Sequence, residues 1–137
     1  MRDAPAGTSD RPAYGARHDP PSIGLIRTLV GVQLYTVTAY VAAAIIPYLW
    51  SPRPYPPTWT WIVPGWLFGF PGHYITALGP MPGILLGLAG VGVLVLARRD
   101  CPTGLYRGCL AATTLAVAYG LFALTPLART IAVFVAH

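Results

Sequence analysis

The chain has 137 residues, of which 55% are hydrophobic and 9% charged, and its formal net charge is +5 at pH 7. Soluble domains carry roughly 25% charged residues, whereas residues 54–97 contain no Asp, Glu, Lys or Arg, only His73. So few charges could not cover the surface of a water-soluble fold, which argues against a soluble protein. The length allows a single domain. We expect an all-α integral membrane protein.

The positive charge comes entirely from arginine, because the chain contains no Lys, and it contains no Glu or Asn either. GC-rich codons favour Ala, Gly, Pro and Arg and disfavour those three residues, so the composition indicates a high-GC bacterium. The N-terminal arginines stand singly among Asp3, Asp10 and Asp19, with no basic helix face. This spacing excludes the usual pattern of a nucleic-acid-binding protein. Anchoring beside an anionic membrane surface explains the arginines better.

Residues 1–22 combine four prolines with Gly, Ser and alternating charges. Such a segment cannot bury enough apolar area to offset the entropy that it would lose on ordering. The sequence therefore predicts a disordered cytoplasmic tail over 1–22 and a transmembrane helical domain over 23–137. The long polar stretch before the first apolar run also argues against a cleavable signal peptide.

The first predicted span covers 29–50 and contains no charged residue. These 22 residues would extend about 33 Å at ~1.5 Å each, enough for a hydrocarbon core of ~30 Å. Arg27 precedes the span and can reach the headgroups, and Tyr48 and Trp50 close its far end as aromatic-belt residues do. Pro47 in the last turn is expected to bend or end the helix.

Gln33, Thr36 and Tyr40 lie at i, i+3 and i+7 on one face of this predicted helix. Buried polar groups in lipid need partners. We therefore expect this polar bundle face to point inward and to form hydrogen bonds between helices. A lining for a small polar solute is the alternative.

Residues 51–72 contain a proline every few positions and three tryptophans. Proline prevents a regular helix, and tryptophan favours the membrane interface. We expect an extended entry followed by an interfacial or shallow re-entrant element on the outer face. His73 follows, far along the chain from His18 and His137, so we expect a solvated interfacial histidine. A quinone or haem contact shared with another subunit is the alternative.

The second predicted span covers 75–97, with two prolines near its start, where they are tolerated. The third covers 108–125 and is interrupted by Pro126. The final residues, 127–137, are too few for another span. They either extend the third helix past a proline kink or lie along the interface.

The uncharged stretch also allows four spans, with helices over about 58–77 and 82–97 and a turn at Gly79-Pro80-Met81-Pro82. Cytoplasmic loops of membrane proteins carry the excess of arginine, and this rule separates the two topologies. With three spans and a cytoplasmic N-terminus, seven arginines lie inside and two outside, whereas four spans divide them five to four. The seven are Arg2, Arg11, Arg17, Arg27, Arg98, Arg99 and Arg107. We expect three spans in the cell (inner or plasma) membrane, with four as the alternative.

Two stripes of small residues follow the second and third predicted spans at every fourth position. They consist of Gly79, Gly83 and Gly87, extended by Gly90, and of Ala112, Ala116 and Gly120. Small residues let helix backbones approach closely in lipid, where hydrophobic association is not available. We expect helix packing through these residues, either between the two spans of one chain or against a second copy or a partner subunit.

No Asp, Glu, Lys, Arg or His lies in the middle of a predicted span, although proton relays and ion-coupled transporters need such groups there. The chain also lacks a Ser/His/Asp set, a HExxH motif and a phosphate-binding loop. Cys101 and Cys109 form no CxxC and have no histidine at ligand spacing, so we expect two unpaired thiols. The sequence predicts no catalytic activity, no cofactor and no metal site.

The leading hypothesis is a small accessory or assembly subunit that acts through helix–helix contacts. Its partners would be the lipid bilayer and either another membrane protein or a second copy. The alternative is an oligomeric pore or lesion former, such as a holin-like or plasmid-transfer (spread) membrane protein, that assembles through Gly79, Gly83 and Gly87. A small transporter or a quinone-site enzyme subunit has least support, because no charge lies within a predicted span.

Overall fold

The computed structural model describes residues 22–51, 62–98 and 101–136. Of these residues 89% are helical and none lies in a strand, so the all-α prediction is confirmed for them. The predicted tail over 1–22 lies outside the described residues except for Ser22. Residues 52–61 of the predicted outer segment 51–72 lie outside them as well.

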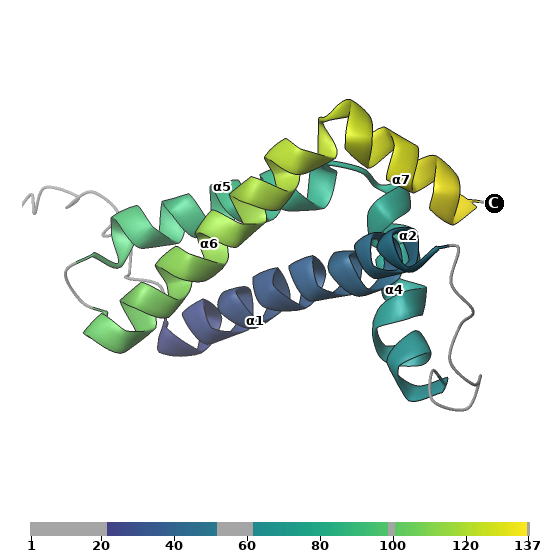
Figure 1. Cartoon of the computed structure of the whole chain (residues 1–137). Coiled ribbons are helices and arrows are strands. Elements are labelled where there is room, and N and C mark those ends of the chain that lie inside the picture. The colour runs from purple at the N-terminus through teal and green to yellow at the C-terminus, as the bar shows by residue number, and fades with distance from the viewer. Residues whose placement is uncertain (1–21, 52–61, 99–100, 137) are drawn as a thin grey trace, which may run out of the picture.

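The helices follow one another along the described parts of the chain (Figure 1). They are α1 (Ile23–Tyr40), η1 (Val41–Ile45), α2 (Ile46–Trp50), η2 (Gly65–Gly69), α4 (Phe70–Ala77), α5 (Met81–Leu96), α6 (Thr103–Ala123) and α7 (Pro126–Ala136). The segments η1 and η2 are turns of π-helix, in which each N–H bonds five residues back and the backbone is wider. Residues 62–64 are helical too and lead into η2.

Three long helices lie side by side along most of the molecule (Figure 1). The helix α6 packs against both α5 and α1, and α1 also contacts α5. The short helices α4 and α7 lie at one end of this three-helix bundle, where both contact η1. The opposite end is formed by the start of α1, the end of α5 and the start of α6.

Two helical segments are long and apolar enough to cross a membrane, namely the continuous run Ile23–Trp50 and the helix Thr103–Ala123. A third candidate is the pair Ile62–Ala77 and Met81–Leu96, if these two helices form one span despite a bend of 95° between them. By length and composition, the described chain therefore has two to three candidate spans.

The first and third of the predicted spans begin earlier in the structure than at 29 and 108. At the start of α1, the Ser22 hydroxyl oxygen accepts a hydrogen bond from the N–H of Leu25 (3.3 Å) and caps the helix. Arg27 and Arg107 consequently lie inside α1 and α6. Arginine is a good helix former, and its long side chain can extend along the helix toward water, so neither charge ends its helix.

The helix expected over 75–97 is divided in two. The first part, α4, ends at Ala77 and α5 begins at Met81, and between them Gly79 has a φ of +63°. Glycine adopts this left-handed conformation without steric cost, and Pro80 lacks the N–H that an uninterrupted helix would need. The bend of 95° turns α4 across the end of the bundle. This geometry differs from the antiparallel hairpin that four spans would require.

Each π-helical segment ends two residues before a proline, Pro47 after η1 and Pro71 after η2. In both segments the residue just before the proline donates its N–H to the carbonyl five residues back. The wider turn accommodates a ring that would clash with the carbonyl four residues earlier in an α-helix. The helix therefore continues through Pro47 to Trp50 instead of ending there.

The C-terminal helix α7 is separate from α6. The Thr125 hydroxyl oxygen accepts a hydrogen bond from the N–H of Ala128 (3.3 Å), and Pro126 is the first residue of the helix. A threonine cap followed by proline is a common way to begin a helix. The new helix direction lets α7 pack against η1, α2 and α4, so its apolar residues cover that end of the bundle.

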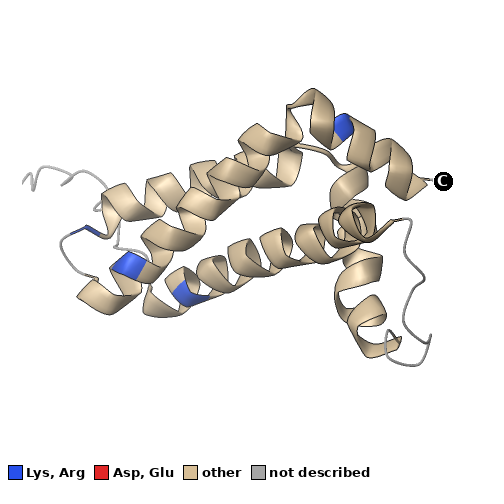
Figure 2. Cartoon of the chain, in the orientation of Figure 1, with Lys and Arg blue, Asp and Glu red and all other residues tan. Residues whose placement is uncertain are grey.

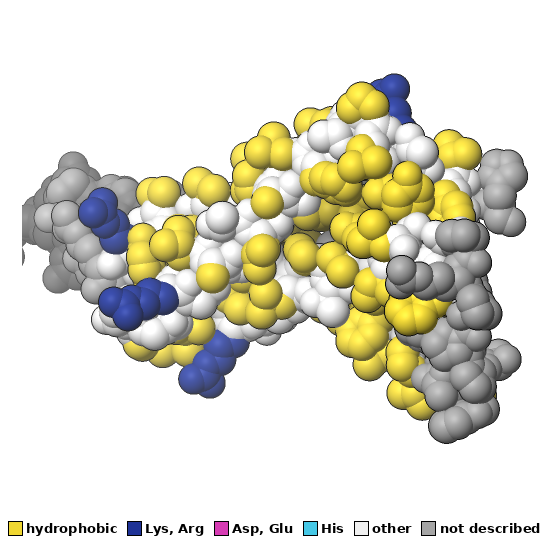
Figure 3. Space-filling view, in the orientation of Figure 1, with side chains coloured by type: hydrophobic (Ala, Val, Ile, Leu, Met, Phe, Trp, Pro, Cys, Tyr) yellow, Lys and Arg dark blue, Asp and Glu magenta, His cyan; other side chains and the backbone are white. Residues whose placement is uncertain are grey.

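The few described charges lie at the ends of the bundle (Figure 2). Arginines occur on α1, on α6 and just after α5 at one end, and on α7 at the other. The described residues include no Asp or Glu. Apolar side chains cover most of the face shown in Figure 3, and on α5 the residues Leu85, Leu88 and Val95 are 63%, 66% and 71% exposed. Such a surface is compatible with a membrane location.

Candidate functional site

A glutamine side chain joins the three long helices inside the bundle. Gln33 on α1 is fully buried. Its amide nitrogen Nε2 donates to the carbonyl of Leu86 on α5 (2.8 Å) and to the hydroxyl oxygen Oγ1 of Thr113 on α6 (3.3 Å). Hydrogen bonds that cross between helices away from water are electrostatically stronger than in water. At Gln33 the polar face predicted from the sequence does link the helices.

Gly90 makes room for this junction. A Cβ at this position would overlap Oγ1 of Thr113 and would lie 2.5 Å from Nε2 of Gln33. The backbone of α5 can therefore approach the two polar side chains only where a side chain is absent. The Gln33 oxygen Oε1 is buried and accepts no hydrogen bond from the described residues, so the junction keeps one free acceptor.

The other two residues of the polar face have different contacts. The hydroxyl of Thr36 donates to the carbonyl of Val32 in its own helix (2.8 Å), a bond that requires no other helix. Tyr40 packs on Tyr119 of α6, with the ring centroids 4.7 Å apart. Both Thr36 and Tyr40 are buried. Thr36 is thus satisfied within α1, whereas Tyr40 also borders a pocket that is considered further below.

The small residues of α5 and α6 meet within one chain. A Cβ on Gly83 would lie 2.7 Å from the Cα of Gly120, and a Cβ on Gly87 would lie 2.8 Å from Cγ2 of Val117. Real Cβ atoms essentially never approach other atoms so closely, so a side chain at Gly83 would push the helices apart and one at Gly87 would displace the Val117 side chain. Close approach of small residues is the usual way for helices to pack in lipid. The structure therefore packs Gly83 against Gly120, and Gly87 against Val117.

Gly79 does not share this contact, because no heavy atom lies within 4 Å of a Cβ built there. It forms the turn between α4 and α5. Ala112 and Ala116, in contrast, are buried in α6. The four-residue spacing that placed Gly79 on the stripe applies only within one continuous helix, and α5 begins two residues later, at Met81.

Tyr119 holds the turn between α4 and α5 from the side of α6. Its hydroxyl donates to the carbonyl of Gly79 (2.8 Å) and lies 3.4 Å from the carbonyl oxygen of Ile75. Carbonyls at a helix C-terminus lack a donor within the helix, so a hydroxyl from another helix stabilises this end. Tyr119 was not among the residues predicted from the sequence to be functional. A lone tyrosine beside Gly120 in a row of small residues was the available signal.

The two cysteines lie at the end of the bundle where α5 leads to α6. Cys109 is buried with Ile26 and Ala97, Cys101 packs nearby, and both are free thiols. Throughout the described ranges, no group of three or more His, Cys, Asp or Glu could hold a metal ion. The cysteines act here as small apolar packing residues.

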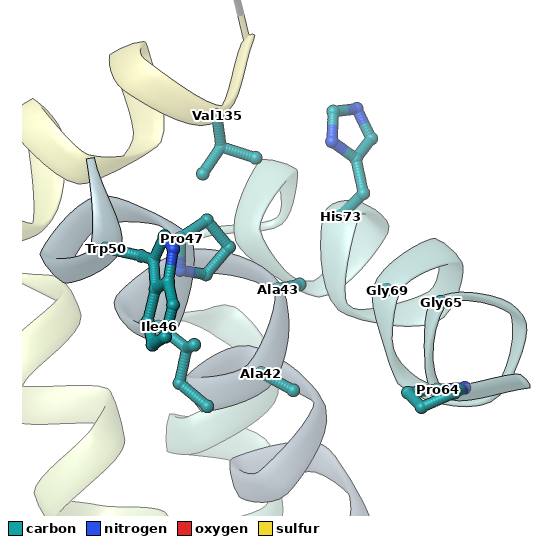
Figure 4. A pocket seen from close by; sticks show the side chains of 10 residues that line it. All are labelled: Ala42, Ala43, Ile46, Pro47, Trp50, Pro64, Gly65, Gly69, His73 and Val135. Atoms are coloured by element: carbon teal, nitrogen blue, oxygen red, sulfur yellow. The ribbon is translucent and has the colours of Figure 1, made fainter. Parts of the chain in front are cut away.

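An apolar pocket of about 280 Å³ opens between the η1 turn and the helix that contains η2 (Figure 4). Small side chains or bare backbone form much of its wall, including Ala42, Ala43, Gly65 and Gly69. The helix α7 contributes Val135. Concave, mainly apolar pockets with few polar groups are the usual binding sites of proteins, which makes this pocket the candidate functional site.

Among the described residues that line this pocket, His73 is the only titratable side chain. Its ring points away from Ala42 and Ala43 in Figure 4, the residue is exposed, and its ring centroid lies 6.2 Å from that of Tyr74. For His73 to act in catalysis, a nucleophile or a second acid–base group would have to lie close to its ring. The described residues that line this pocket supply neither.

Gly65 and Gly69 give the pocket an open small-residue surface. No heavy atom of the residues that the structure describes lies within 4 Å of a Cβ built on either residue, in contrast to Gly83 and Gly87. This pair was not predicted from the sequence to be a packing site. Its four-residue spacing was nevertheless the same signal that identified the stripe on α5.

No family model, curated protein or solved structure matches this chain. Its function is therefore inferred from its own geometry. Over residues 22–51, 62–98 and 101–136 that geometry offers close helix contacts and apolar pockets.

Proposed function

We propose that this chain is a multi-pass protein of the cell membrane, without catalysis of its own, that acts as an accessory or assembly subunit. It binds an apolar helix of a partner protein in the pocket between η1 and η2. The proposal rests on a contrast between two sets of glycines. Gly83, Gly87 and Gly90 already contact another helix of the same chain, whereas Gly65 and Gly69 line a pocket that is open.

The placement of arginine supports an orientation with the start of α1 on the cytoplasmic side. Arg27, Arg98 and Arg107 belong to one end of the bundle, and positive residues are enriched on the cytoplasmic side of membrane proteins. The run from α1 to α2, then α5, then α6 would form three crossings. The 16 residues of α5 extend only about 24 Å, so the turn toward α4 would complete the second crossing.

The pocket suits a helix better than a polar ligand. Helices in lipid associate through van der Waals contact between closely approaching backbones, which small residues permit. Ala42 and Ala43 on one wall and Gly65 and Gly69 on the other provide such surfaces. The pocket also lies beside two π-helical turns, irregularities that are frequent at functional sites.

Replacement of Gly69 by leucine tests this proposal, because the new side chain would fill the pocket. Gly92→Leu on α5 is the matched control, since a Cβ at either position meets no heavy atom within 4 Å but only Gly69 lines the pocket. The measurement is the mass of the particle extracted from the native host membrane in a mild detergent. After the mass of bound detergent is subtracted, we expect wild type and Gly92→Leu to exceed the 14.6 kDa of the single chain, and Gly69→Leu to fall back to it.

A wild-type particle that contains one chain and no partner would refute the accessory role. Loss of the partner from both leucine variants would show that the pocket is not the docking surface. A particle of two chains that only Gly69→Leu dissociates would keep the docking surface but identify its occupant as a second copy.

The alternative function, an oligomeric pore or lesion former, has less support. Gly83 and Gly87 already contact α6 of the same chain, so assembly through them would require the interface between α5 and α6 to open. Regulated over-expression separates the two functions. A membrane potential that collapses as the wild-type chain accumulates would favour a pore, and an unchanged potential favours the accessory role.

A further inference from the structure

A second pocket, of about 270 Å³, lies where α1, the turn between α4 and α5, and the turn between α6 and α7 meet. Its lining includes Tyr40, Thr76, Gly79 and Arg129. It differs from the first pocket in having a phenol and a guanidinium group at its wall. Both could bind an acceptor supplied by a ligand.

Tyr40 contributes a hydroxyl that lacks a partner. The residue is 4% exposed, and its ring packs against Tyr119 and, at 6.3 Å between centroids, against Phe122. Within the described residues its hydroxyl takes part in no hydrogen bond. In the described chain the fully buried polar atoms without a partner do not include this hydroxyl oxygen, so it remains accessible where Tyr40 lines the pocket. It can therefore donate a hydrogen bond to an acceptor group of a ligand.

Arg129 contributes a positive charge to the same pocket. It is the only arginine in the described chain that lies on α7, at the end opposite the other described arginines. It forms no ion pair within residues 22–51, 62–98 and 101–136, which include no Asp or Glu. An anion that pairs with Arg129 at this wall would be supplied by a ligand.

The ends of two helices add acceptors. Ala77 and Ala123 are the last residues of α4 and α6, and both line the pocket. The last carbonyls of a helix have no donor within the helix and carry the negative end of its dipole. They are therefore suited to accept hydrogen bonds from hydroxyl groups. A ligand that matches all these groups carries an anion and hydroxyl donors side by side.

We propose that this pocket binds the headgroup of an anionic glycerophospholipid with free hydroxyls, of the phosphatidylglycerol type. The phosphate oxygens accept hydrogen bonds from Tyr40 and Arg129 as charge-assisted pairs, and the headgroup hydroxyls donate to the helix-end carbonyls. The acyl chains follow the exposed side chain of Leu124, which lines the pocket. The inference rests on the membrane location in the proposed function, which brings lipids to this end.

Native mass spectrometry of the full-length, lipid-depleted chain in a non-ionic detergent tests the proposal. The probes are phosphatidylglycerol, phosphatidylcholine with the same acyl chains, and inorganic phosphate. We expect phosphatidylglycerol to bind about tenfold more tightly than phosphatidylcholine. Arg129→Gln and Tyr40→Phe should each remove most of this preference. The controls are Arg27→Gln, which removes an equal charge at the other end, and Tyr74→Phe, which removes an exposed phenol on α4.

Equal affinity for the two lipids would overturn the proposal, and so would an equal loss in Arg27→Gln and Arg129→Gln. Displacement of the lipid by an equimolar amount of inorganic phosphate would assign the site to a free anion and would also overturn it. Extraction of native membranes with alkaline carbonate tests the membrane location separately. A chain released by carbonate refutes the proposed function, whereas a retained chain without the lipid preference refutes only this inference.

Discussion

Gly90 and Gly92 are two positions apart on α5 and have opposite surroundings. A Cβ on Gly90 overlaps the hydroxyl oxygen of Thr113, whereas no heavy atom lies within 4 Å of a Cβ on Gly92. Two residues along a helix correspond to about half a turn, so the two positions lie on nearly opposite faces. Sequence spacing assigned Gly90 to the packing side. It could not show that a buried Gln33 from another helix would lie there.

A matched pair of alanine substitutions tests this difference. Gly90→Ala should lower the free energy of unfolding by roughly 1–3 kcal/mol, because the junction of Gln33 and Thr113 must open to admit the methyl group. Gly92→Ala should leave it unchanged or raise it by up to about 1 kcal/mol, since alanine loses less backbone entropy than glycine. Unfolding by SDS in mixed micelles, followed by circular dichroism, measures both. Equal effects would contradict the described junction.

Among the elements, η2, which leads into α4, is joined to α1 by a hydrogen bond that a proline makes available. Pro71 has no N–H, so the carbonyl of Leu67, four residues earlier, lacks its α-helical donor. The hydroxyl of Tyr35 on α1 donates to this carbonyl (2.6 Å), and the rings of Tyr35 and Phe68 lie 5.9 Å apart. The proline thus both widens the helix into η2 and leaves an acceptor for a neighbouring helix.

A double-mutant cycle on Tyr35 and Pro71 tests this coupling. Tyr35→Phe alone should lower the free energy of unfolding by about 1 kcal/mol, because the Leu67 carbonyl loses its donor. In a Pro71→Ala background the same change should cost less, since the new N–H can donate to that carbonyl. The same micellar unfolding assay gives the interaction energy. An unchanged cost of Tyr35→Phe in the two backgrounds would show that the bond is independent of the proline.

For the whole molecule, the membrane topology depends on which side of the membrane each end of the bundle occupies. The described arginines other than Arg129 lie at one end of the bundle (Figure 2), where Cys101 packs near Ile26 and Ala97. Ser51 follows α2, which lies at the other end (Figure 1). Three crossings with a cytoplasmic start of α1 place Cys101 inside and Ser51 outside. Four crossings with the same start would place both outside, since residues 62–77 and 81–96 would each cross.

Labelling with a membrane-impermeant maleimide distinguishes these topologies. Native Cys101 should react in inside-out vesicles and not in intact cells, whereas Ser51→Cys in a Cys101→Ser background should react in intact cells. Cys109 is buried and should remain unlabelled in both preparations, so Cys101→Ser provides the background signal. Labelling of Cys101 from outside intact cells would contradict the three-crossing orientation.

Much of the fold was predictable because it depends on properties of single helices. Apolar length indicates candidate spans, and proline and glycine mark interruptions. The sequence predicted a turn at Gly79 and Pro80 in the four-span alternative and not in the three-span topology. The sequence could not give its angle of 95°, because that angle depends on Tyr119, whose hydrogen bond to Gly79 joins residues 40 positions apart.

The sequence by itself determined that this chain is apolar and helical, that its arginines gather near helix ends, and that small residues repeat at helical spacing. Only the tertiary structure decided which small residues are used. Gly83 and Gly87 pack against α6, Gly79 forms a turn, and Gly65 and Gly69 remain open at a pocket. The physical reason is that periodicity defines the face of one helix, whereas the partner of that face depends on contacts between distant segments.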